Sequence, residues 1–157
     1  MTLYEGPIFR VERRDNRDVV VHAPVAAVVA VDREDRLTLV RQRRVPVDTS
    51  LLELPAGFID GDESPLEAAR RELAEETGLR GGEWVELASF FTSAGFTDER
   101  VDLFLATGLV AGDASPEEDE ELEIVRIPLP EVAGLIDEIT DAKTLIGLLL
   151  LVRDRHL

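Results

Sequence analysis

The chain has 157 residues, of which 33 are acidic and 17 are basic, so its formal net charge is −16, and it contains no cysteine. This length suits a single domain with one core, spanning residues 1–157. The charge argues against nucleic acid and anionic membranes as partners, because both repel a polyanionic protein unless a cation intervenes. The lack of cysteine excludes disulfides, thiolate nucleophiles and thiolate metal sites.

The sequence contains no recognisable signal peptide. Its apolar run at residues 145–152 includes Gly147 and is too short to cross a bilayer. We therefore expect a cytoplasmic protein with no membrane partner.

The first third of the chain has the pattern of β-structure. Strands are expected over residues 8–12, 18–22, 25–31, 36–42 and 51–54. The first two alternate in polarity around a turn at Asp15-Asn16, which predicts an N-terminal β-hairpin. The third is almost wholly apolar, as is typical of a strand buried on both faces. The fifth is expected to end before Pro55.

A helix with both ends marked is predicted over residues 65–77. Ser64 is a good N-cap, Pro65 suits the first helical position and Glu67 completes a capping box. Good helix formers follow, and Gly78 supplies the left-handed residue that commonly ends a helix. Both boundaries of this helix therefore follow from local signals.

The remainder of the chain returns to strands and then to helices. Strands are expected over residues 86–92, 100–107 and 121–127, and helices over residues 131–138 and 141–153. Strands before and after a central helix, with helices at the end, predict an α/β (α+β) sandwich with a mixed central sheet.

Three glutamates of the central helix crowd one side of it. Glu72, Glu75 and Glu76 fall within an arc of roughly 100° beside the apolar stripe. Like charges spaced i, i+4 destabilise a helix, whereas a divalent cation would reverse the sign, and hard oxygen ligands suit Mg²⁺ or Mn²⁺. Arg71 lies one turn before Glu75 and is placed to orient it. The plainer alternative is a solvated acidic face on an ordinary amphipathic helix.

The glutamates belong to a longer spacing pattern. The pattern G-x5-E-x7-R-E-L-x-E-E-x-G-L is filled at every specified position by Gly57, Glu63, Arg71, Glu72, Leu73, Glu75, Glu76, Gly78 and Leu79. This pattern resembles the signature of the Nudix hydrolases. Flanking segments resemble the ADP-ribose pyrophosphatase branch of that family: residues 18–22, 39–44, 52–57, 93–99 and 118–123. Ala94 departs from that branch, which commonly has proline there.

The resemblance implies a Nudix-type α/β/α sandwich and an enzyme that hydrolyses a nucleoside diphosphate linked to another group. The expected reaction is cleavage of ADP-ribose to AMP and ribose 5-phosphate. The implied metal ligands are Glu72, Glu75, Glu76 and the carbonyl of Ala56, with Mg²⁺ as cofactor and Mn²⁺ as a substitute. A cation held there would neutralise the pyrophosphate charge, polarise phosphorus and lower the pKa of a bound water.

The resemblance also implies a general base in the late acidic segment. Glu120 matches that position best and Glu118 is second, while the signature glutamates, Glu75 among them, are an alternative that geometry would decide. Glu63 is expected to hold its loop to the helix, or else only to favour the helix dipole.

Substrate binding is expected from a group of arginines and from one loop. Arg41, Arg43 and Arg44 cluster near a strand end, and Arg44 matches the family position best. Phe96 is a candidate for stacking on adenine, and Glu99 belongs to the same loop. The plain alternatives are surface arginines and a core aromatic.

Two further readings remain open at this point. In the first, the chain is a Nudix enzyme for another substrate: a nucleoside triphosphate, a GDP-sugar or a dinucleoside polyphosphate. In the second, it is a Nudix module that senses a nucleotide sugar without cleaving it. The expected partner is a small-molecule nucleotide sugar. A homodimer is expected, with residues 1–22 as the candidate dimer-forming segment.

Overall fold

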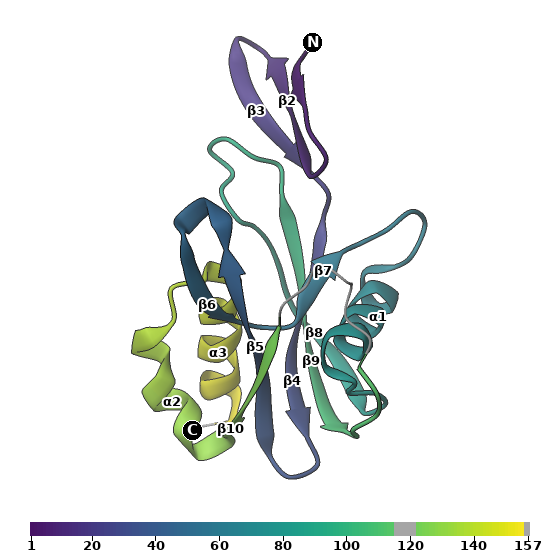
Figure 1. The fold of residues 1–157 in the computed structure, drawn as a ribbon, viewed down its shortest axis with the longest axis vertical. Helices are drawn as coiled ribbons and strands as arrows, with labels where there is room; N and C mark the ends of the chain where they lie inside the picture. Colours follow the sequence, from purple (N-terminus) through teal and green to yellow (C-terminus); the bar gives the residue numbers. More distant parts are fainter. Residues whose placement is uncertain (115–121, 156–157) are drawn as a thin grey trace.

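The computed structural model describes residues 1–114 and 122–155 (Figure 1). The strands are β1 (Thr2–Glu5), β2 (Phe9–Arg14), β3 (Arg17–His22), β4 (Val25–Asp32), β5 (Arg36–Arg44), β6 (Thr49–Glu53), β7 (Ala56–Phe58), β8 (Glu83–Phe91), β9 (Arg100–Leu109) and β10 (Glu123–Pro128). The α-helices are α1 (Pro65–Thr77), α2 (Val132–Leu135) and α3 (Ala142–Arg155), and short 3-10 turns are η1 (Val45–Val47), η2 (Leu129–Glu131) and η3 (Ile136–Glu138).

The strands form two sheets. The larger runs in the order β10-β5-β4-β9-β8, with β6 added to β5 and β7 added to β4. Strands β4 and β9 are parallel, whereas the other pairs are antiparallel, so the sheet is mixed as expected. The smaller sheet, β1-β2-β3, stands beyond one end of the larger sheet (Figure 1).

Strand β4 is the centre of the core, because its successive side chains face opposite layers. Ala26, Val28 and Ala30 pack toward α1, with Leu73 among their neighbours. The alternate residues of β4 pack on the other face, where α3 contributes Leu148. This two-sided burial explains the continuous apolar run and confirms the expected α/β/α sandwich.

Helix α1 has the bounds predicted from its local signals. The Ser64 hydroxyl accepts a hydrogen bond from the Glu67 N–H, and the Glu67 carboxylate accepts one from the Ser64 N–H at 2.7 Å. Gly78 ends the helix with φ of +74°. The capping box and the glycine therefore satisfy the backbone groups that a helix leaves open at its two ends.

Three elements differ from the sequence-based expectation. β1 adds a third strand to the predicted hairpin; all of its residues are exposed, so no alternation of burial marked it. β7 is only three residues long and follows Pro55 directly. The helix expected over residues 131–138 is broken into η2, α2 and η3, in a stretch that contains Gly134, a poor helix former. None of the described helices is long and apolar enough to span a membrane.

Candidate active site

The centre of the candidate site is the contact between α1 and β7. Glu76 is only 5% exposed, and its Oε2 accepts a hydrogen bond of 3.2 Å from the Ala56 N–H at the start of β7. A buried carboxylate is costly unless it has partners. The packing of α1 on the sheet therefore places Glu76 against the residue whose carbonyl is an expected metal ligand.

Gly57 allows β7 to lie directly on the carboxylate of Glu72. A Cβ at position 57 would lie 2.0 Å from the Glu72 Cδ, so the Glu72 carboxylate would have to move. Glycine therefore permits the close approach of the β7 backbone to this carboxylate. The first residue of the signature and its central glutamate are thus in direct contact.

Arg71 joins the glutamates of the signature into one network. Its Nη2 donates to Glu63 Oε1 at 2.6 Å, and its Nη1 donates to Glu72 Oε1 at 2.6 Å and to Glu75 Oε2 at 3.2 Å. Nη2 also donates to the carbonyl of Phe58 at 3.0 Å, which ties the guanidinium to β7. One arginine therefore holds three carboxylates and the adjoining strand in register.

These contacts shift the pKa values of Arg71 and Glu63 and stabilise their charged forms. The hydrogen bond to Glu63 is the main reason that the pKa of Arg71 lies above its ordinary value. In return, the hydrogen bond from Arg71 and that from the Asp60 N–H lower the pKa of Glu63. Glu63, on the loop before α1, is therefore ionised and fastens that loop to the helix.

The donor set fits a hard divalent cation. Glu72, Glu75, Glu76 and the Ala56 carbonyl are all oxygen donors, the type that Mg²⁺ and Mn²⁺ prefer, and the Gly57 backbone leaves room beside Glu72. Within the described residues, no three acidic or histidine side chains already converge at metal-binding spacing. Glu72 and Glu75 instead both contact the Arg71 guanidinium.

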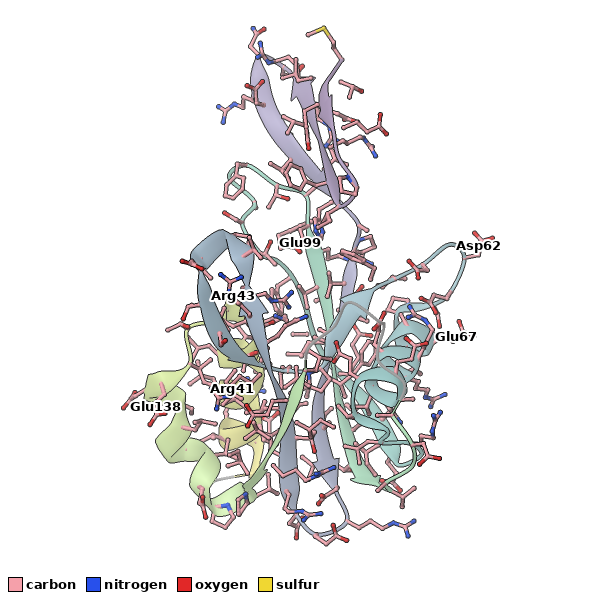
Figure 2. The ribbon with its side chains drawn as sticks, in the orientation of Figure 1. Arg41, Arg43, Asp62, Glu67, Glu99 and Glu138 are labelled. Atoms are coloured by element: carbon pink, nitrogen blue, oxygen red, sulfur yellow. The ribbon has the colours of Figure 1, made fainter. Side chains whose placement is uncertain are left out.

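The three arginines expected to bind substrate lie on β5 but face two sides. Strand alternation sets Arg44 apart from Arg41 and Arg43. Arg41 pairs with Glu123 of β10 at 3.2 Å, and Arg43 pairs with Asp48; Figure 2 labels both arginines.

Arg44 lies nearer the carboxylates, since the charge of Glu76 contributes to a raised Arg44 pKa, of which the hydrogen bond to Glu53 is the main cause. The structure therefore brings Arg44 within electrostatic range of Glu76.

The loop of residues 93–99 is held by the small sheet. The Val20 N–H of β3 donates to the Phe96 carbonyl at 2.8 Å, and the Asp98 carboxylate accepts from the His22 N–H at 3.0 Å. Glu99 accepts a 2.5 Å hydrogen bond from the Thr92 hydroxyl and lies between the two sheets (Figure 2). Phe96 keeps its ring exposed. β3 therefore supports the loop on which both candidate substrate residues lie.

Two expected residues and two clefts beside α1 lie apart from this group of carboxylates. Glu118 and Glu120 lie outside the described residues. Clefts of about 330 and 290 Å³ both border Trp84, beside α1, and neither is lined by the signature glutamates. The carboxylate site is therefore identified by its chemistry and its contacts.

A model of the NUDIX domain matches residues 21–146. The chain belongs to the Nudix family. The resemblance inferred from the signature is therefore confirmed, as is the expectation of a Nudix pyrophosphohydrolase. Nudix hydrolases generally need a divalent metal ion, in agreement with the oxygen donors described above.

Known Nudix relatives agree with this assignment. The chain is 37% identical to the "ADP-ribose pyrophosphatase" of Bacillus subtilis (strain 168), with 84% of this chain and 74% of that protein covered. It is 38% identical to the "Methanol dehydrogenase activator" of Bacillus methanolicus, with 83% and 73% covered. A crystal structure of an "ADP compounds hydrolase" superposes with a TM-score of 0.83 at 24% identity, covering 99% of this chain and 92% of that one. This last likeness confirms the Nudix fold.

Sequence reasoning missed the partners of Arg44. Glu53, the last residue of β6, is 2% exposed and binds both Arg44 and Lys143. One signal was available, because Glu53 is the single charged residue in the apolar run from Leu51 to Leu54. Lys143 lies 90 positions further along the chain, and nothing local connects it to this Nudix site.

Proposed function

We propose that this Nudix enzyme hydrolyses the pyrophosphate bond of ADP-ribose to give AMP and ribose 5-phosphate. The observation that carries the proposal is the carboxylate group of α1, held by Arg71 and packed on Ala56 and Gly57. A relative of 37% identity carries the name ADP-ribose pyrophosphatase, which supports ADP-ribose as the substrate. A small-molecule nucleotide sugar is thus the expected partner.

The proposed metal ligands are Glu72, Glu75, Glu76 and the Ala56 carbonyl, with Mg²⁺ as the cofactor and Mn²⁺ as a substitute. When bound, such an ion neutralises the charge of the diphosphate and polarises phosphorus toward attack by water. Arg71 keeps the helix and β7 in register, and Glu63 anchors the preceding loop through Arg71. These residues hold α1, β7 and the loop before α1 together.

Arg44 is the proposed contact to the substrate diphosphate, because its guanidinium lies within electrostatic range of Glu76. Phe96 has an exposed ring that suits stacking on adenine, and Glu99 is a candidate to bind a sugar hydroxyl. Arg41 and Arg43 are proposed only as outer contacts, since each pairs with a carboxylate on the other side of β5. Glu120, with Glu118 second, stays the proposed general base.

We also propose that residues 1–157 form one domain and that the enzyme is a cytoplasmic homodimer that pairs through residues 1–22. The small sheet exposes the apolar side chains Leu3, Tyr4, Ile8 and Phe9, which supports a self-contact there. Light scattering of the whole chain and of a Tyr4→Glu variant tests the pairing. A monomeric parent protein would contradict it.

The substrate is tested with a panel assayed with and without Mg²⁺. The panel is ADP-ribose, ADP-glucose, GDP-mannose, diadenosine polyphosphates and nucleoside triphosphates. We expect the highest kcat/KM on ADP-ribose, with AMP as a product and little turnover after chelation of the metal. A higher kcat/KM on GDP-mannose or a triphosphate would reject ADP-ribose, and binding without turnover of any compound would indicate a sensing module.

A further inference from the structure

The carboxylate of Glu53 is buried at the edge of the candidate site. It ends β6, pairs in register with Val40 of β5 and is 2% exposed. A carboxylate removed from water destabilises a fold unless charged partners surround it. Its partners therefore explain why an ionisable residue occupies this position.

Glu53 has two cationic partners from distant parts of the chain. Arg44 donates to it twice, from Nε to Oε1 at 2.7 Å and from Nη2 to Oε2 at 2.8 Å. Lys143, near the start of α3, donates to Oε2 at 2.5 Å. Burial by itself would raise the pKa of Glu53, but the Arg44 hydrogen bonds and the Lys143 charge outweigh it and lower that pKa. Glu53 is thus an anion at neutral pH and lies between two cations.

The pair with Glu53 fixes the orientation of Arg44 but occupies only some of its hydrogen-bond donors. A guanidinium has five N–H donors in one plane, and Glu53 engages only two of them. A bidentate pair also sets the orientation of that plane, which a single hydrogen bond does not. Lys143 pairs with Asp141 as well as with Glu53, so the network contains two cations, Arg44 and Lys143, and two anions, Glu53 and Asp141.

We propose that Glu53 is a positioning residue that holds the Arg44 guanidinium plane toward the diphosphate of the substrate, an inference that rests on the proposed function. Glu53 does not contact substrate and acts only through Arg44. The three remaining donors of Arg44 are those that receive phosphate oxygens. Loss of Glu53 therefore weakens substrate binding and leaves the chemical step nearly unchanged.

A matched control exists at the opposite end of β5. Asp32, 5% exposed, accepts from Arg36 Nε at 2.9 Å, in a buried carboxylate–arginine pair at the β4–β5 turn. Asp32 also accepts from the backbone N–H groups of Glu34 and Arg36, so it closes a turn. The Asp32 pair resembles the Glu53 pair in burial and charge but lies outside the candidate site. A substitution of Asp32 therefore shows the effect of losing a buried ion pair on stability, without any effect on the position of Arg44.

The test measures kcat, KM and melting temperature for Glu53→Gln and Asp32→Asn, with ADP-ribose and saturating Mg²⁺. We expect Glu53→Gln to raise KM about 10-fold with kcat within about threefold, the loss typical of one charged hydrogen-bond pair. Asp32→Asn is expected to lower the melting temperature with KM unchanged. If Glu53→Gln lowers the melting temperature and leaves KM at the parent value, the positioning role is overturned.

A double-mutant cycle tests whether Glu53 acts through Arg44. Arg44→Lys keeps the charge but lacks the planar fork, so we expect Glu53→Gln to change KM less than twofold in that background. If the fold-changes in KM of the two single variants multiply in the double variant, the proposal is overturned. If Glu53→Gln does not fold, Lys143→Met takes its place. This variant removes the second cation from Glu53, so the full charge of Glu53 acts on Arg44, and we expect KM to rise severalfold. An unchanged KM would count against the proposal.

Failure of this inference is distinguishable from failure of the proposed function. A parent protein that does not cleave ADP-ribose rejects the function, whereas an active parent with an unaffected Glu53→Gln rejects the positioning role. Binding of ADP with Mg²⁺, measured by calorimetry, tests Glu53 independently of turnover. We expect Glu53→Gln to weaken the affinity for ADP about 10-fold, and an equal affinity in parent and variant would overturn the proposal.

Discussion

Helices α1 and α3 cover the two faces of the same strand, β4, but they bury different chemistry. α3 faces the core with large apolar side chains, among them Leu148 and Leu151. α1 faces it with the small residues Ala68 and Ala69, and it buries Glu76 as well. Small side chains let α1 approach the sheet closely, which brings its carboxylates against β7.

The difference shows that stability and chemistry are divided between the two layers. The α3 layer follows the ordinary rule that burial of apolar surface stabilises a fold. The α1 layer accepts adjacent carboxylates at positions 72, 75 and 76, an arrangement that is unfavourable without a cation or an arginine to offset it. Substitutions of the α1 glutamates should therefore change activity first, and substitutions of the buried leucines of α3 should change stability first.

The largest expected effect is that of Glu76→Gln on turnover. Gln keeps an oxygen to accept from the Ala56 N–H but removes the charge, so we expect the free energy of unfolding to stay constant or rise by a few tenths of a kcal/mol. We expect kcat to fall by at least about 100-fold, because even the outer partners of a metal ligand are worth about 10- to 100-fold. Steady-state kinetics on ADP-ribose and urea unfolding measure the two quantities.

The control for Glu76→Gln is Glu83→Gln, at the exposed start of β8. That variant is expected to keep the parent kcat. Parent-like turnover in Glu76→Gln would remove Glu76 from the metal ligands and with it the contrast between the two helices.

The next effect is that of Leu148→Ala on stability. Leu148 is 0% exposed in the α3 layer, so its truncation should lower the free energy of unfolding by about 2–5 kcal/mol. The neighbouring Leu149 is 50% exposed, and Leu149→Ala should cost less than about 0.5 kcal/mol. Denaturant unfolding compares the two. At a temperature where both variants are folded, KM should match the parent; a raised KM in Leu148→Ala would show that the layers are not separate.

The smallest effect concerns the start of α1. Ser64→Ala removes the hydroxyl that accepts from the Glu67 N–H and should cost about 1 kcal/mol. Thermal unfolding measures it, with Ser64→Thr as a control that retains a capping hydroxyl. Because the glutamates lie two turns further along, kcat should be unchanged. A large fall in kcat without a fall in stability would show that the cap itself shapes the site.

Some elements of the fold could be predicted from the sequence and others could not, for a physical reason. The bounds of α1 follow from Ser64, Pro65 and Gly78, because caps act within a few residues. The two-sided burial of β4 follows from its apolar run. By contrast, β1 and β7 exist only through pairing with other strands and carry no strong pattern of their own.

The arginines of β5 show most clearly what sequence-based prediction could not determine. Arg41, Arg43 and Arg44 form one group in the chain, whereas strand alternation divides them between two faces of the sheet. Which face meets α1 depends on how β5 pairs with β4 and β10, and that is a property of the whole sheet.

The spacing from Gly57 to Leu79 was enough to identify the family and the carboxylates, because a helix converts spacing into a common face. Tertiary structure alone decided which residues from distant parts of the chain meet around the site. Glu53 meets Lys143 across 90 positions, and the Asp98 carboxylate meets the His22 backbone across 76. Contacts between residues this far apart in the sequence form only when the sheet and both helical layers have packed. No local sequence pattern encodes them.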